Sequence, residues 1–173
     1  MRPHGAPNGL RRRRIDRPRD VQAPRALVAR RAVAQTHGCE LRAELMPERP
    51  SASLDAPGSV TLRVTTDCTQ PLKVTLSTSP HRPGFAQVSA VDTKGRPVPQ
   101  EPPLVNDVGG ASGLVDFGSA KPFEQRLVLS DFLKFTTPGP YELSVKHQLP
   151  VGKSRDDLEW ITLNVSTPLE LTP

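Results

Sequence analysis

Short segments in which apolar and polar residues alternate dominate the sequence after residue 40. In residues 59–66, SVTLRVTT, the side chains of Val60, Leu62 and Val64 fall on one face of an extended chain. Such alternation predicts a half-buried β-strand. Further segments of this kind are 41–45, 72–77, 85–91, 124–129, 141–148, 160–165 and 169–172. Together they predict an all-β domain in which two antiparallel sheets pack face to face.

The twenty prolines and twelve glycines of the chain fit turns between short strands better than they fit long helices. The sequence has no apolar run of about 18 residues, so we expect no membrane-spanning helix. It also has no apolar core of about 7 to 15 residues after its basic start, so we expect no secretory signal. The compartment stays open, cytoplasmic or extracytoplasmic.

The formal charge of +5 is concentrated at the start of the chain. The first 40 residues hold ten arginines and three acidic residues, a net charge of +7, whereas the rest holds thirteen basic and fifteen acidic residues. Residues 1–37 also lack aromatic side chains, which predicts a disordered basic tail ahead of one folded domain at residues 38–173. Within the tail, residues 24–35 could form a short helix that begins at Pro24 and is marginal on its own.

The densest basic run in the tail is Arg11, Arg12, Arg13 and Arg14. Guanidinium groups near phosphates release counterions and bind without reading sequence. One hypothesis is therefore anion or nucleic-acid binding through this tail. The alternative is compositional bias, because the chain has seventeen arginines and six lysines.

Residues 136–141, TTPGPY, predict a Pro-Gly turn that leads into a strand at Tyr141. Alternation along this strand turns Tyr141 inward, and a tyrosine at such a corner can hydrogen-bond to upstream backbone. His147 shares the inward parity of Tyr141, so we interpret it as a structural histidine at a partly exposed strand end. The outward positions of the strand are Glu142, Ser144 and Lys146.

Four further segments bear on the type of sandwich: PGSVTLRV (57–64), VDTKGRPV (91–98), EQRLVLSDFLKF (124–135) and TPGPYELSV (137–145). Their arrangement resembles a group of bacterial immunoglobulin-like domains, including domains similar to intracellular proteinase inhibitors. The resemblance implies an immunoglobulin-like antiparallel sandwich of about seven to nine strands. It also implies an alternative function, in which a loop is presented to a protease. The candidate loops are residues 96–103 and 106–113.

The motifs that could carry chemistry are incomplete. VGKS at 151–154 lacks the first glycine of a P-loop, because that position is His147. SRDDLEW at 154–160 gathers three carboxylates without the spacing of a calcium loop. His37 and Cys39 offer two neighbouring ligands where structural zinc needs about four. We therefore predict no catalytic residue, cofactor or metal site.

The resulting functional expectation is a non-catalytic binding or interaction module. We expect its partner to be a protein, of an identity that the sequence does not specify. The oligomeric state also stays open.

Cys39 and Cys68 are the two cysteines of the chain. If residues 41–45 pair with residues 59–66 about a turn near 52–53, the numbers of facing residues sum to about 105. The two cysteines then come within one position of facing each other, and we expect their Cα atoms to be roughly 4.5 to 5.5 Å apart. Bond formation would require an oxidising compartment.

Overall fold

The computed structural model describes residues 28–77, 85–102 and 112–173. The strands within these residues are β1 (Ala32–Thr36), β2 (Cys39–Pro47), β3 (Ser51–Ser53), β4 (Ser59–Thr66), β5 (Leu72–Ser77), β6 (Ala86–Asp92), β7 (Ser112–Phe117), β8 (Phe123–Val128), β9 (Gly139–Gly152) and β10 (Glu159–Thr172). Two short 3-10 helices, η1 (Leu129–Asp131) and η2 (Arg155–Asp157), accompany them. In this part of the chain, no helix is long and apolar enough to cross a membrane.

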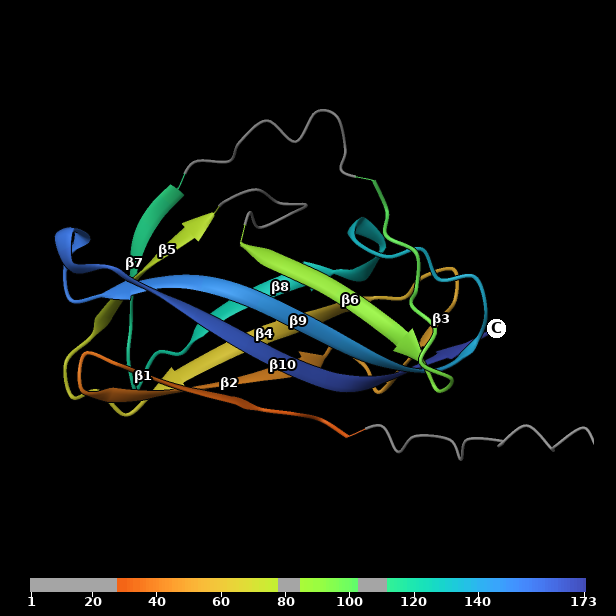
Figure 1. Cartoon of the computed structure of the whole chain (residues 1–173), viewed down its shortest axis with the longest axis horizontal. Helices are drawn as coiled ribbons and strands as arrows, with labels where there is room; N and C mark the ends of the chain where they lie inside the picture. Colours follow the sequence, from red (N-terminus) through yellow and green to blue (C-terminus); the bar gives the residue numbers. More distant parts are fainter. Residues whose placement is uncertain (1–27, 78–84, 103–111) are drawn as a thin grey trace, which may run out of the picture.

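The strands form two sheets, one in front of the other in Figure 1. The four-stranded sheet has the order β1-β2-β4-β8, and the six-stranded sheet has the order β3-β10-β9-β5-β7, with β6 also paired to β9. The chain is therefore all-β with two sheets, as its alternation predicts. The strand pairs of the described residues are antiparallel, except that β3 runs parallel to β10.

The long hairpin of β9 and β10 is the frame of the six-stranded sheet (Figure 1). Its register runs from Glu159 opposite Val151 to Leu171 opposite Gly139. The other edge of β9 serves two partners, because β6 pairs with its first half and β5 with its last residues. The strands of this sheet are thereby aligned across one continuous outer face.

The core lies between the two sheets and takes alternate residues from the strands on both sides. Burying a leucine or valine side chain contributes about 1.5 to 3 kcal/mol, so the alternation commits each strand to one orientation. Fully buried aliphatic side chains include Leu41, Val60, Leu62, Val64, Leu72, Leu127, Leu143, Leu149 and Leu163.

Residues 97–101 cover the free edge of β6. The amide of Val98 donates to the carbonyl of Ala90 in β6 (2.9 Å), and the amide of Glu101 donates to the carbonyl of Phe132, beyond β8 (2.8 Å). The segment therefore connects β6, at the edge of the six-stranded sheet, with the residues that follow β8 of the four-stranded sheet. These hydrogen bonds satisfy backbone groups that an open edge would expose.

Strand β1 shows that the folded part of the chain begins before residue 38. Ala32, Ala34 and Thr36 alternate toward the interior, and β1 pairs with β2 along its length. Just before β1, Arg30 exchanges two backbone hydrogen bonds with Ser166 of β10 (2.8 and 3.1 Å).

The predicted domain boundary at residue 38 and the helix at 24–35 are therefore wrong for the described residues of those segments. The physical reason is that β2 and β10 supply backbone partners to a segment whose own helix propensity is marginal. Residues 1–27, the rest of the predicted tail, lie outside the described residues.

Strands β2 and β4 are antiparallel neighbours, with a register that differs from the predicted one. Leu41 faces Thr66 and Leu45 faces Leu62, so the numbers of facing residues sum to 107 rather than 105. The connection is longer than a hairpin turn because β3 lies within it and pairs with β10 in the other sheet. A difference of two leaves each side chain on its predicted face.

Candidate functional site

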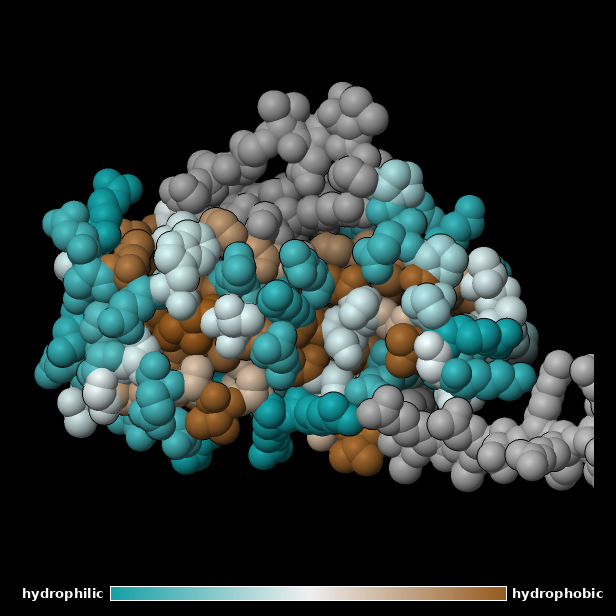
Figure 2. Space-filling view, viewed as in Figure 1, coloured by the Kyte–Doolittle hydropathy of each residue, from teal (hydrophilic) through white to brown (hydrophobic). Residues whose placement is uncertain are grey.

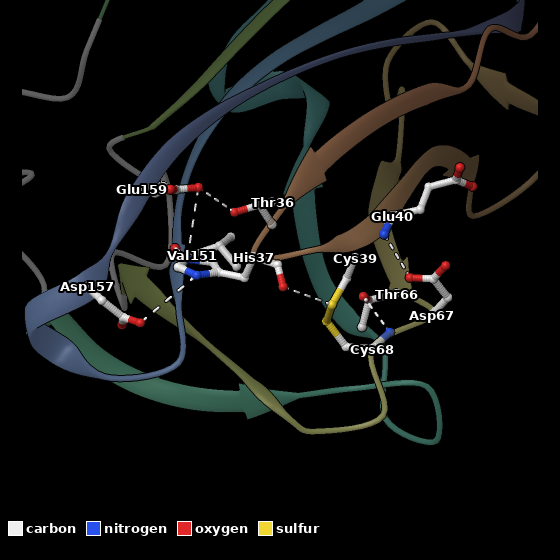
Figure 3. Close-up of a disulfide and its surroundings, with 10 residues drawn as sticks. All are labelled: Thr36, His37, Cys39, Glu40, Thr66, Asp67, Cys68, Val151, Asp157 and Glu159. Carbon is white, nitrogen blue, oxygen red and sulfur yellow. Dashed lines mark hydrogen bonds and ion pairs between the residues drawn. A yellow bond between two sulfur atoms is a disulfide. The ribbon is translucent and has the colours of Figure 1, made fainter.

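A disulfide between Cys39 and Cys68 closes one end of the β2–β4 pair (Figure 3). Cys39 begins β2 and Cys68 lies two residues beyond β4, so the register brings them opposite each other. Their Cα atoms are 5.2 Å apart. The amide of Cys68 also donates to the hydroxyl of Thr66 (3.2 Å). The end of the four-stranded sheet is thus closed covalently.

His37, in the turn between β1 and β2, lies between two carboxylates (Figure 3). Its Nδ1 is 4.0 Å from an oxygen of Asp157, and its Nε2 is 4.0 Å from an oxygen of Glu159. The Thr36 hydroxyl donates to the same Glu159 oxygen (2.7 Å), across 123 positions of sequence. His37 and two carboxylates of the SRDDLEW segment, which belong to separate incomplete motifs of the sequence, therefore lie side by side in the fold. Their spacing along the chain does not reveal this proximity.

The contacts of His37 hold the turn between β1 and β2 against η2 and the start of β10. Asp157 accepts hydrogen bonds from the Ser154 amide (2.6 Å) and hydroxyl (3.1 Å). The bond from this amide is the main reason that the pKa of Asp157 lies below its usual value. Among the described residues, no group of three or more His, Cys, Asp or Glu side chains is placed to hold a metal ion.

The VGKS segment closes around the same carboxylate. A Cβ atom at Gly152 would lie 2.7 Å from the Asp157 carboxylate, so the close approach requires glycine. Because the Ser154 amide donates its hydrogen bond to the Asp157 carboxylate, this amide is not free to bind a phosphate.

His147 is buried in the interior of β9, and its predicted place at a partly exposed strand end is wrong. Only 2% of the residue is exposed, because β9 continues to Gly152. Its Nε2 donates to the side-chain oxygen of Gln125 on β8 (2.6 Å), and Nδ1 has no hydrogen-bond partner among the described residues. Burial lowers the pKa of His147 to about 4. This neutral histidine joins the two sheets through the core.

Tyr141 occupies the corner at the start of β9, where it is 4% exposed. Its hydroxyl donates to the carbonyl of Thr137, four residues upstream (2.6 Å), and lies 3.0 Å from the Thr137 hydroxyl. The ring packs edge-on against Phe135, with 5.0 Å between centroids. Tyr141 thereby fixes the turn that feeds the central strand.

Replacing Tyr141 with phenylalanine is expected to lower the free energy of unfolding by about 1 to 3 kcal/mol, because the hydrogen bond made by this buried side chain is lost. Urea unfolding of the wild type and Tyr141→Phe measures the difference. Thr137→Val is the control that separates the two contacts, since it removes the Thr137 hydroxyl and keeps the carbonyl. An unchanged midpoint in Tyr141→Phe would show that the corner bond contributes nothing.

Several predicted sites fall wholly or partly outside the described residues. These are Arg11, Arg12, Arg13 and Arg14 of the tail and residues 106–111 of the glycine-rich loop. The described part of the other candidate loop, residues 96–102, has backbone hydrogen bonds toward β6 and toward the chain after β8. The side chain of Arg96 also pairs with Asp92 (2.6 Å).

The outer face of the six-stranded sheet carries a polar groove of about 300 Å³. The side chains that line it are those of Arg30, Ser89, Glu142, Ser144, Lys146, Asn164 and Ser166, with Val145 and Val165 beneath. Figure 2 shows the molecule from the side of β6, β9 and β10, where hydrophilic side chains stand apart with hydrophobic surface between them. This face is the candidate binding surface.

Two polar residues of the groove are largely buried. Glu142 is 9% exposed as a residue, but its carboxylate is not fully buried, and no hydrogen bond or ion pair reaches it from the described residues. Ser166 is 5% exposed, and its buried hydroxyl has no partner among the described residues. Buried polar groups are ordinarily paired, so the Ser166 hydroxyl is an exception.

An aromatic pair lies farther along the same face. Trp160 is 62% exposed, and its ring meets that of Phe85 edge-on at 5.2 Å between centroids. Trp160 shares the outward parity of Asn164 on β10, where the intervening Ile161 and Leu163 face the core. The outer face therefore combines a polar groove with an exposed indole ring.

Sequence reasoning placed Glu142, Ser144 and Lys146 on an outward face without identifying a site. The alternation in β9 is the signal that finds them. Their grouping with Asn164 and Ser166 depends on the β9–β10 register, which becomes visible only in the sheet.

Comparison of this chain with protein-family models, curated proteins and solved structures finds no match.

Proposed function

We propose that this chain is a non-catalytic binding module, built on an immunoglobulin-like sandwich, that recognises its ligand through the outer face of β6, β9 and β10. The arrangement of the sheets supports this type of sandwich. Two sheets of almost entirely antiparallel strands pack face to face around one core, as the sheets of such domains do. The hydrogen bond from Tyr141 to upstream backbone supports it as well.

The observation that carries the binding role is Trp160, which is 62% exposed on the same outer face as the groove lined by Glu142, Ser144 and Lys146. Tryptophan is enriched where binding energy is concentrated, so an exposed indole ring beside a polar groove favours a role in binding.

The described histidines support a binding role over catalysis. His37 is held between Asp157, Glu159 and a backbone carbonyl, and His147 is buried against Gln125. A general base must reach a proton on its substrate, and both rings are engaged in holding the fold.

The disulfide favours an oxidising compartment, because thiols are kept reduced in the cytosol of most organisms. We therefore place the binding activity outside the reducing cytosol.

The alternative of a protease-inhibiting loop stays a prediction. Residues 96–102 fit it poorly. An inhibitory loop must offer unpaired backbone amides and carbonyls to the protease, and backbone groups of this segment are already hydrogen-bonded to β6 and to the chain after β8. The outer face, in contrast, has polar groups that are free to pair.

An array that displays oligosaccharides and peptides tests the proposed function. We expect the oxidised full-length chain to bind a ligand on the array, to lose that binding in Trp160→Ala and to release the ligand chemically unchanged. Val33→Ala is the matched control, because Val33 is 61% exposed on β1 of the other sheet. Binding that depends on Val33 and not on Trp160, or turnover of the bound ligand, would overturn the proposal.

A further inference from the structure

We propose that the groove on the outer face of β6, β9 and β10 binds a neutral oligosaccharide, whose chain continues along β10 to stack on Trp160. This inference rests on the proposed function, and it names the ligand class of the same face.

The floor of the groove is a row of serines that crosses three strands. Ser144 of β9 faces Ser89 of β6 on one side and Ser166 of β10 on the other. Neighbouring strands are about 4.8 Å apart, so three small hydroxyl side chains in register make a trough across the sheet. At the β10 end of this row Arg30 pairs with Ser166, which extends the groove to the edge of the sheet.

Larger side chains form the two walls. On one side, Lys146 of β9 faces Gln87 of β6 and Asn164 of β10. On the other side, Glu142 faces Pro168 of β10. A ligand in the trough would thus meet hydroxyl groups below it, an ammonium and two amides on one wall, and a carboxylate on the other.

The accessible polar groups define what the ligand must offer. The Glu142 carboxylate can only accept hydrogen bonds, so the ligand must donate to it. Ser89 is exposed and Ser144 is half-buried in the same groove, and their hydroxyl groups can donate or accept. Adjacent hydroxyl groups on a sugar ring meet both requirements, because each of them donates and accepts.

The charges around the groove favour a neutral ligand. Arg30 and Lys146 would repel a cation, and the carboxylate of Glu142 would repel an anion. A polyhydroxyl ligand pairs with all three groups without carrying a charge, and hydrogen bonds to charged groups are stronger than neutral ones.

Trp160 indicates a ligand longer than one sugar. Asn164 lies four positions farther along β10, a distance of about 13 Å along the strand. Gln148 and Thr162, which face each other, lie on the outer face between the two. A pyranose ring has an apolar face that suits the indole ring supported by Phe85, and polar edges that suit the side chains along the way.

The test is isothermal titration of the oxidised full-length chain with neutral gluco-, xylo-, manno- and N-acetylglucosamine oligosaccharides. We expect one of these classes to bind, with affinity rising as the chain lengthens. Glu142→Gln keeps the shape and removes the charged acceptor, so it should weaken binding about tenfold or more. Ser144→Val fills the trough and should abolish binding, whereas Val33→Ala should bind as the wild type does. Circular dichroism melting of each variant verifies that it is folded.

Three outcomes separate this inference from the proposed function. No binding of any oligosaccharide, or binding unaffected by Glu142→Gln and Ser144→Val, would overturn the saccharide site. If the array then showed peptide binding that Trp160→Ala removes, the binding face would stand with a different ligand class. If neither an oligosaccharide nor a peptide on the array lost its binding in Trp160→Ala, both proposals would fail.

Discussion

Removal of the Cys39–Cys68 disulfide is expected to lower the free energy of unfolding by about 3 to 4 kcal/mol. The bond joins residues 29 positions apart, and closing a loop of about 30 residues restricts the unfolded chain by this amount in the chain-entropy description. The loop encloses β2, β3 and β4, which belong to both sheets, so the loss should affect the whole sandwich.

Urea unfolding of the oxidised wild type and the Cys39→Ala/Cys68→Ala variant measures this difference. Dithiothreitol should bring the wild type close to the double variant and should leave the double variant unchanged, which controls for the packing lost with the sulfur atoms. A double variant that matches the oxidised wild type would contradict the expected stabilisation.

Acidification from neutral pH to pH 4 is expected to cost roughly 3 kcal/mol of stability through His147 alone. Its folded-state pKa is about 4 and its reference value is 6.5, because burial disfavours the charged ring. Between pH 6.5 and about pH 4 the His147 ring is protonated in the unfolded chain and neutral in the folded chain. Stability therefore falls as the pH drops through this range, and the loss levels off below about pH 4. Each unit of difference corresponds to about 1.4 kcal/mol.

Urea unfolding at a series of pH values, on the wild type and His147→Gln, measures this contribution. Glutamine at position 147 is neutral throughout and can still pair with Gln125, so the variant should lose roughly 3 kcal/mol less over the same range. His37→Gln is the control, and it should keep the steep dependence that His147 confers. Equal slopes in the wild type and His147→Gln would show that the ring is protonated in the folded state.

The alternation of residues predicts β2, β4, β5, β6, β8, β9 and β10, whereas β1, β3 and β7 are not among the predicted strands. In β4, β9 and β10 it follows the observed burial closely, because a strand has two faces and a one-residue slip would expose every core side chain. The corner at Tyr141 was also readable, since proline and glycine fix the turn locally and the tyrosine follows directly.

Features that depend on partners distant in sequence could not be predicted. Strand β1 exists because β2 and β10 lie beside it, and β3 leaves the expected hairpin because β10 offers a parallel edge. The burial of His147 depends on where β9 ends and on Gln125 in the opposite sheet. In each case the local sequence permits more than one conformation, and the tertiary partner selects one.

The candidate site divides in the same way. The sequence alone determined that Glu142, Ser144 and Lys146 point away from the core, because their parity on β9 is fixed by the strand period. Only the tertiary structure decided that Ser89 and Ser166 extend this row into a groove and that Trp160 shares its face, because hydrogen bonds between strands set the register that brings them together.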